Sequence, residues 1–256
     1  MNIPILAYHK INDKLEWGIN TVPIQNFKNQ IKYLFENNYY SISLKDYLNK
    51  NYEVEWNRKP VIITFDDSDE SIYKHAYPIL KKYNFTGTIF IISNFVGKNN
   101  SWDSNLGGIY SQHLNWKQII FLSNQGWEIG SHTKNHPDLR LLPDEHVLNE
   151  LKDSKTLLET RIGKSVDFLS YPFNRFDERI ISFAQKCGYK GGCALNSRHK
   201  FAGSISQFFI QRCGVYSIDT LKAYKRKLSN SWIELAKQRI ISFFSIGTIY
   251  YNQIKK

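Results

Sequence analysis

The chain has 256 residues, of which 15% are aromatic, so it is long enough to bury a substantial core and a disordered tail is excluded. Its formal net charge of +11 at pH 7 favours an acidic partner, such as nucleic acid, a charged glycan or an anionic membrane, without choosing among them. Its three cysteines lack paired CxxC spacing, which excludes a structural zinc site of that type.

Short apolar runs bounded by turn residues recur along the chain and predict buried strands. They cover residues 3–8, 61–65, 87–92, 126–131, 166–171 and 208–211. Apolar residues at helical spacing lie between these runs, as at Phe27, Ile31, Leu34 and Phe35. Buried strands that alternate with helices predict a single α/β domain, a distorted (β/α) barrel of seven or eight units. An open doubly wound sheet is the alternative.

The two ends of the chain carry separate expectations. The opening residues, MNIPILAYHK, have no basic leader and only a short apolar run, which predicts a cytoplasmic protein. We expect the barrel to span residues 1–229 and a basic amphipathic helical segment to span 230–256. This segment would pack on the barrel or make peripheral contact with the inner face of an anionic membrane. Dispersed basic residues without a recognised motif predict no specific nucleic-acid partner.

Polar side chains follow two of the predicted strands. Asp66 and Asp67 come directly after the strand at 61–65, and like charges this close repel unless a cation or proton lies between them. His132 and His136 follow the strand at 126–131, four residues apart. The carboxyl ends of parallel strands share one end of a barrel, so these groups can converge. Two imidazoles and a carboxylate suit zinc, nickel, cobalt or iron, with positions left open for water and substrate.

Four segments of the chain carry a family resemblance. TFDD at 64–67 and HTKNH at 132–136 resemble two motifs of the polysaccharide deacetylases, the fourth family of carbohydrate esterases, also called the NodB-homology family. ILAYHKI at 5–11 and LSYPFN at 169–174 resemble motifs of the branch that includes the poly-N-acetylglucosamine deacetylases. The resemblance implies a metal-dependent hydrolase that removes the N-acetyl group from an acetylated amino sugar. Whether that sugar is free, polymeric, lipid-linked or nucleotide-linked stays open.

The resemblance also assigns roles at the metal. Asp67, His132 and His136 would bind a divalent ion, zinc first among nickel, cobalt and iron. Asp66 would be the general base that takes a proton from water. Arg212, in IQRCGV, would orient this base, because many members place an arginine where this chain has Ser170.

Three further residues would act on the substrate. The backbone N–H of Phe173 would stabilise the oxyanion, with Tyr171 beside it as a substrate-binding residue. His9, in the AYHK segment, would be the general acid that protonates the leaving amine.

Two departures from the family pattern motivate an alternative. Ser68 follows TFDD, and Asn174 follows the YP-aromatic segment, at positions where glycine is usual. The alternative function is therefore a catalytically inactive glycan-binding protein with the same fold. The other histidines are expected on the surface or in loops, namely His75, His113, His146 and His199. Three tryptophans are candidates either for sugar stacking or for the core, namely Trp102, Trp116 and Trp127.

Overall fold

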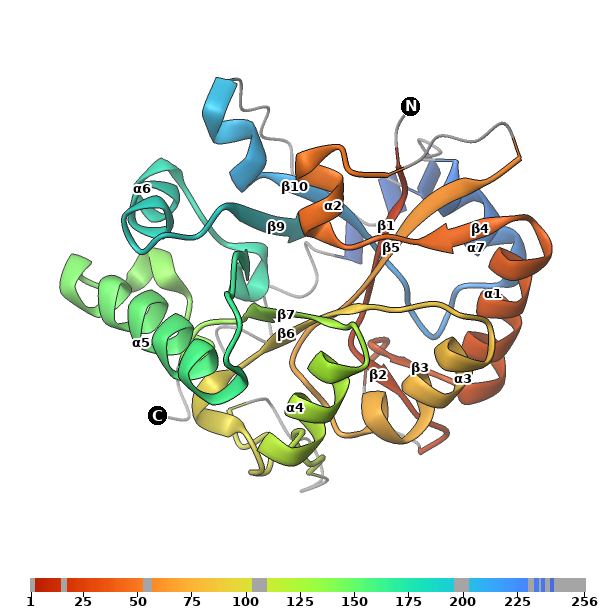
Figure 1. The fold of residues 1–256 in the computed structure, drawn as a ribbon, viewed down its shortest axis with the longest axis horizontal. Helices are drawn as coiled ribbons and strands as arrows, with labels where there is room; N and C mark the ends of the chain where they lie inside the picture. Colours follow the sequence, from red (N-terminus) through yellow and green to blue (C-terminus); the bar gives the residue numbers. More distant parts are fainter. Residues whose placement is uncertain are drawn as a thin grey trace.

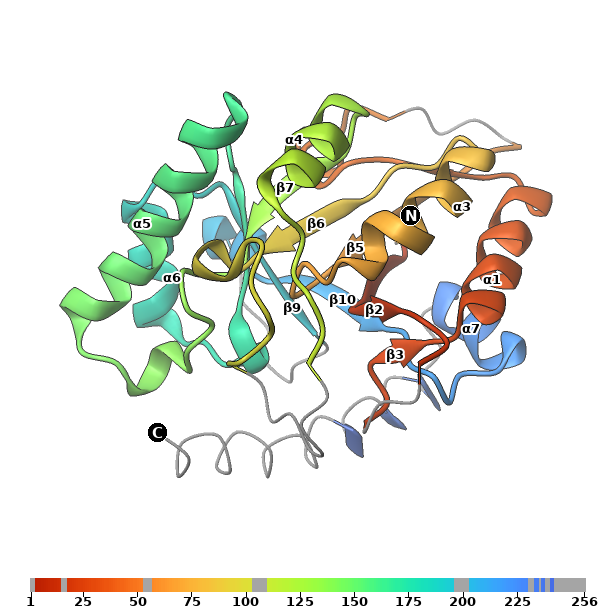
Figure 2. The ribbon, with the colours of Figure 1, turned by 90° about the horizontal axis from the view of Figure 1, so that it is seen from below.

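A parallel barrel forms the centre of the molecule (Figures 1 and 2). The structure is a computed structural model that describes residues 3–14, 18–52, 57–102, 110–195 and 203–229, with 233–234, 236–237 and 240–241 beyond them. Among these residues, eight strands form one sheet in the order β1-β10-β9-β8-β7-β6-β5-β4. The strands are β1 (Ile5–Tyr8), β4 (Tyr39–Ser41), β5 (Lys59–Phe65), β6 (Thr88–Ile91), β7 (Glu128–Ser131), β8 (Phe168–Ser170), β9 (Gly191–Leu195) and β10 (Ile210–Gly214).

Strand β1 closes the barrel, because it pairs in parallel with both β10 and β5. Residues 5–8 of β1 align with residues 62–65 of β5. The short β4 pairs with the beginning of β5 and stays outside the ring. In the described part of the chain the ring thus has seven strands, and the predicted (β/α) barrel is confirmed. A separate pair, β2 (Lys10–Ile11) and β3 (Thr21–Val22), follows β1.

Helices surround the strands (Figure 1). They are α1 (Ile24–Glu36), α2 (Leu44–Asn49), α3 (Tyr77–Lys82), α4 (Trp116–Asn124), α5 (Asp144–Ile162), α6 (Glu178–Lys186) and α7 (Leu221–Leu228). Helix α1 buries Phe27, Ile31 and Leu34, as the spacing predicts, whereas Phe35 is half exposed. Helix α5 ends at Gly163, whose φ of 68° closes the helix in a left-handed conformation. No described helix combines the length and apolarity needed to cross a bilayer.

Alternation along β5 decides which side chains face the inside of the barrel. Val61, Ile63 and Phe65 belong to the large cluster packed under the helices, while Ile62 belongs to the interior cluster. Successive residues of a strand point to opposite faces, so Asp66 continues the inward series. Strand β10 does the same, because Ile210 is in the interior cluster and Arg212 lies two residues later. The ends of β5 and β10 therefore bring Asp66 and Arg212 together inside the barrel.

Strand β9 is the ring strand that the sequence analysis missed. Its segment, GGCAL, begins with two glycines and lacks the β-branched or aromatic residues that mark a strand. A Cβ on Gly192 would lie 2.2 Å from the Tyr171 hydroxyl, so only glycine fits where β9 packs against β8. Close packing outweighs strand propensity at this position.

The C-terminal segment reaches the barrel through ion pairs. Arg226 of α7 pairs with Glu234, and Lys237 lies 2.7 Å from Asp219. The Asp219 side chain is fully buried and also pairs with Lys227. The rest of the predicted helical segment at 230–256 lies outside the described residues, so its extent stays a prediction.

Candidate active site

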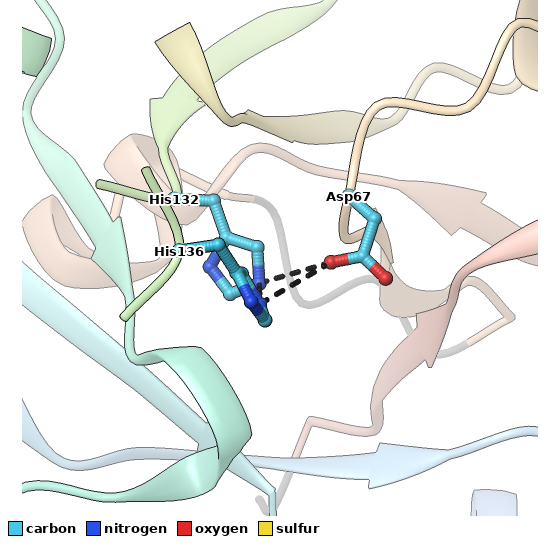
Figure 3. A group of neighbouring side chains, drawn as sticks. All are labelled: Asp67, His132 and His136. Atoms are coloured by element: carbon cyan, nitrogen blue, oxygen red, sulfur yellow. Dashed lines mark hydrogen bonds and ion pairs between the residues drawn. The ribbon is translucent and has the colours of Figure 1, made fainter. Parts of the chain in front are cut away.

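Three side chains converge at the carboxyl-terminal end of the strands (Figure 3). Asp67 follows β5, while His132 follows β7 directly and His136 lies in the next turn. Asp67 Oδ1 lies 3.3 Å from His132 Nε2 and 3.6 Å from His136 Nε2. The two Nε2 atoms are 3.2 Å apart. Among the described residues, this is the one group of His, Cys, Asp or Glu whose spacing suits a metal ion.

The donor set fits a divalent cation. Two nitrogens bound to zinc at about 2.0–2.1 Å in a tetrahedral arrangement are roughly 3.4 Å apart, close to the separation of the histidine Nε2 atoms. His132 Nδ1 lies 2.8 Å from the Ser170 carbonyl, to which it donates, so Nε2 carries the lone pair that a metal needs. Three inward donors with open positions match a catalytic site better than a closed structural one.

The titration of these groups follows from burial and mutual contact. Burial alone would raise the pKa of Asp67, but the His132 hydrogen bond and the nearby histidines hold it well below the usual range. Burial and the neighbouring His132 lower the pKa of His136 to about 3, so this imidazole is neutral at pH 7. An ionised carboxylate beside a neutral imidazole is the state that binds a metal.

The loop between the two histidines is fixed by Glu150 of α5. This carboxylate accepts hydrogen bonds from the backbone N–H groups of Lys134 and Asn135, at 2.9 and 2.8 Å. It also accepts one from the Asn135 side chain at 2.6 Å. Glu150 is 8% exposed, so these bonds are shielded from water. Glu150 carries no signal of this role in the sequence, because an acidic residue in a helix resembles an ordinary solvated one.

Asp66 is held by Arg212. The guanidinium donates to both carboxylate oxygens at 2.8 Å, and its other contacts are Thr64 Oγ1 at 2.9 Å and Ser170 Oγ at 2.8 Å. Burial would raise the pKa of Asp66, but Arg212 and then His132 lower it below its usual value. The carboxylate is therefore ionised at neutral pH, as a general base must be.

A cavity of about 170 Å³ opens over these groups. His9, Phe173 and Tyr171 line it, together with Asp66, the three converging side chains and Arg212. His9 Nδ1 is buried and has no hydrogen-bond partner among the described residues. The Tyr171 hydroxyl donates a hydrogen bond to the Phe208 carbonyl, and the Tyr171 backbone N–H donates one to the Cys193 carbonyl. Both donors of Tyr171 are therefore already engaged within the protein. Ile241, from the C-terminal segment, is also in the wall.

The unusual turn residues take left-handed backbone conformations. Ser68 has φ of 55° and Asn174 has φ of 58°, values that glycine adopts without strain. Phe173 has φ of 56° and its ring lies 4.5 Å from that of His136. The chain thus forms glycine-like turns with serine and asparagine at the two positions.

His113 lies in a loop, one of the two locations expected for it, but it is buried and not on the surface. It is 3% exposed, and it accepts a hydrogen bond from Trp102 Nε1 at 2.9 Å. Burial lowers the pKa of His113. No spacing rule finds this residue, because residues 112–114 reach the site by pairing with residues 68–70. His75 is half-buried and His146 exposed, while His199 lies outside the described residues.

The three tryptophans divide between core and site. Trp127 is 4% exposed and packs on Phe65 in the core. Trp116 is half-buried at the start of α4, with the Arg161 guanidinium over its ring. Trp102 lines the active-site cavity, and its ring centroid lies 4.1 Å from that of His136. Only Trp102 of these three is placed to meet a sugar.

Known proteins share this fold and sequence pattern. The Bacillus subtilis (strain 168) protein YxkH is 32% identical over 191 residues, which are 74% of this chain and 63% of that protein. A poly-beta-1,6-N-acetyl-D-glucosamine N-deacetylase of Staphylococcus aureus (strain MSSA476) is 28% identical over 187 residues, 70% of this chain and 62% of the enzyme. This chain therefore spans less than two thirds of the length of these relatives.

A solved structure agrees. The deacetylase PplD of Streptococcus pyogenes, in complex with acetate, matches 88% of this chain and 97% of its own, with a TM-score of 0.72 and 25% identity. Residues 53–192 match the family described as polysaccharide deacetylase. This range contains Asp66, Asp67, His132 and His136, the groups that converge at the carboxyl-terminal end of the strands. The chain belongs to the polysaccharide deacetylase family.

Proposed function

We propose that the chain is a metal-dependent hydrolase that removes the N-acetyl group from an acetylated amino sugar of a glycan and releases acetate. The observation that carries this proposal is the position of Asp66, paired with Arg212, beside the convergent Asp67, His132 and His136 in one cavity. The name of the Staphylococcus aureus relative supports an N-acetylated polymer as the substrate class.

Asp67, His132 and His136 would hold the divalent ion, with zinc as the first candidate and nickel, cobalt or iron as the others. When bound, such an ion lowers the pKa of water toward about 7 and polarises the acetamide carbonyl. The Ser170 carbonyl keeps His132 in the required tautomer, and Glu150 keeps the loop that carries His136 in place.

Asp66 takes the proton of the attacking water. Its two oxygens are fixed by Arg212, so the carboxylate does not need to reorganise when the proton arrives. The same ion pair keeps Asp66 ionised despite burial.

The remaining steps use two further residues that line the cavity, Phe173 and His9. The Phe173 N–H donates to the oxyanion, which forms as the water oxygen adds to the carbonyl carbon. His9 supplies a proton to the nitrogen as the C–N bond breaks, so that a free amine and acetate leave. Both assignments are supported by the positions of these residues in the cavity wall and by the matching family segments.

An acetate-release screen combined with elemental analysis tests the proposal. The purified protein is expected to contain close to one divalent ion per chain and to release acetate from an N-acetylated amino-sugar oligomer. Asp66→Asn is expected to keep the metal and lose the release. Tight metal binding without turnover of any N-acetylated substrate, in wild type and variant alike, would instead favour the inactive glycan-binding protein.

A further inference from the structure

Two consecutive residues with positive φ turn the chain at the end of β5. Asp67 has φ of 64° and Ser68 has φ of 55°. Adjacent side chains of an extended strand point to opposite faces, yet Asp66 and Asp67 both line the active-site cavity. The turn directs the Asp67 carboxylate toward the two histidines, whereas Asp66 remains paired with Arg212. The direction of the Asp67 carboxylate therefore depends on the backbone conformation of Ser68.

Ser68 adopts this conformation at a cost that glycine would not incur, because a Cβ crowds the following carbonyl oxygen when φ is positive. The segment at 112–114 holds the serine in place. The Leu114 N–H donates to the Ser68 carbonyl at 2.8 Å, and the Glu70 N–H donates to the Gln112 carbonyl at 2.8 Å. Ser68 is fully buried, so its hydroxyl also needs a hydrogen-bond partner inside the protein.

His113 is the partner of that hydroxyl. Its Nδ1 lies 3.3 Å from Ser68 Oγ, and its Nε2 accepts a hydrogen bond from Trp102 Nε1 at 2.9 Å. An imidazole nitrogen that accepts a hydrogen bond carries no proton, so the ring is neutral and its one N–H is on Nδ1, which donates to Ser68 Oγ. The two contacts of His113 are therefore separable, since Nδ1 bonds the turn and Nε2 bonds the indole.

We propose that His113 is a positioning residue for the metal ligand Asp67 and acts through the Ser68 hydroxyl. The hydrogen bond from Nδ1 keeps the serine in its left-handed conformation, and this conformation keeps Asp67 Oδ1 3.3 Å from His132 Nε2. This inference rests on the proposed function, because it takes Asp67, His132 and His136 as the ligand set. A glycine at position 68 would need no such partner, so the serine and the histidine form a matched pair.

Two substitutions of His113 separate its two contacts. The side-chain nitrogen of asparagine can take the place of Nδ1, and the side-chain oxygen of glutamine can take the place of Nε2. His113→Asn therefore keeps a donor to Ser68 and loses the acceptor for Trp102, whereas His113→Gln does the reverse. Zinc affinity is measured on the full chain by competition with a chromophoric chelator. We expect His113→Gln to weaken zinc binding about tenfold and His113→Asn to weaken it less than about threefold.

Ser68→Gly supplies a second test, because glycine takes a positive φ without a partner. In this background His113→Gln should change zinc affinity by less than about twofold, so that the two substitutions are strongly non-additive. His146→Gln, at an exposed position, is the matched control and should bind zinc as the wild type does. Urea denaturation of the metal-free variants shows whether each one is folded in the assay.

Ser68→Ala tests the same hydrogen bond from the other side if His113→Gln does not fold. Alanine keeps the Cβ and removes the hydroxyl, so zinc binding should again weaken about tenfold. Unchanged zinc affinity in folded Ser68→Ala would overturn the positioning role.

The outcomes distinguish this inference from the proposed function. Wild-type affinity in His113→Gln, or an equal loss in the serine and glycine backgrounds, overturns the positioning role and leaves the hydrolase. An equal or greater loss in His113→Asn also overturns it, since a purely structural histidine would not depend on Nδ1 alone. Zinc binding that depends on the pair, without acetate release by the wild type, supports the positioning role and overturns the hydrolase. A wild type that binds neither zinc, nickel nor cobalt overturns both.

Discussion

Arg212 and Asp66 form a two-pronged ion pair inside the barrel, although 146 residues separate them in the chain. Both side chains are almost completely buried, so each charge depends on the other for the solvation that water would provide. This dependence makes Arg212→Met informative. The variant should lose about 3–5 kcal/mol of unfolding free energy, measured by urea denaturation. Lys74→Met, which breaks an exposed pair with Glu70, should lose less than about 1 kcal/mol.

The pH dependence of this loss has a defined sign. The folded-state pKa of Asp66 is lowered, so its contribution to stability is full above the unfolded pKa of about 4 and is lost as the pH falls through the folded value. The stability difference between wild type and Arg212→Met should therefore be largest at neutral pH and shrink in acid. In an active variant with a weaker ion pair, such as Arg212→Lys, the pKa of Asp66 should be higher than in the wild type, so kcat/KM should begin to fall at a higher pH as the solution is acidified. A difference that grows in acid would contradict the assignment.

Asp66→Asn tests the general base. The amide cannot accept the proton of water, so kcat should fall by about 10²–10⁴-fold. Metal content, measured by elemental analysis, should not change, because Asp66 is not among the three convergent donors. Substantial remaining activity in Asp66→Asn would show that another residue is the general base.

Metal removal should abolish acetate release and lower the thermal midpoint. A ligand present at 100 times its Kd stabilises the folded state by about 2.7 kcal/mol, so adding zinc to the chelated protein should raise Tm. His136→Ala, which removes one of the two imidazoles, should reduce both the shift and the bound metal. An unchanged Tm and metal content in this variant would contradict the proposed ligand set.

Glu150→Ala tests the support of the histidine loop. Loss of the acceptor leaves the N–H groups of Lys134 and Asn135 without their partner, so His136 should be held less firmly. We expect metal affinity to fall about 10–100-fold, with activity largely restored at saturating metal. Glu145→Ala, on the exposed side of the same helix, should behave as wild type.

Removal of residues 230–256 tests the role of the C-terminal segment. Asp219 and Arg226 would each lose an ion-pair partner, and Ile241 would leave the cavity wall, so stability should fall and KM should rise. We also propose, from the basic amphipathic pattern alone, that binding to anionic lipid vesicles should decrease. Full-length protein with Lys237→Met and Glu234→Gln is the control, since it breaks the ion pairs and keeps the segment. Equal vesicle binding by truncated and full-length protein would reject the membrane proposal.

The sequence predicted the parts of the site that strand periodicity controls. Buried runs place Asp66, Asp67 and His132 at strand ends, and parallel strands bring such ends together. These inferences need only local pattern and the barrel. Arg212 was identified in another way, from the family resemblance, as a substitute for the arginine that many members carry where this chain has Ser170.

The parts that were missed depend on tertiary contacts between irregular segments. His113 and Trp102 lie in long connections with no periodicity, and their hydrogen bond is visible only in three dimensions. Glu150 looks like a solvated helix residue until the histidine loop packs on it. Strand β9 escaped detection because its glycines serve close packing and carry no strand propensity.

The direct pairing of β1 with both β5 and β10 sets the order in which the molecule can mature. During synthesis the first strand and β5 emerge early, but the edge that β10 occupies stays open until residue 210 has left the ribosome. A nascent chain that stops before this point contains Asp66 but lacks Arg212, so it cannot bury the ionised Asp66 carboxylate with a charge partner. Because β10 both closes the barrel and carries Arg212, the pairing of Asp66 with Arg212 and the closure of the barrel occur in the same folding step.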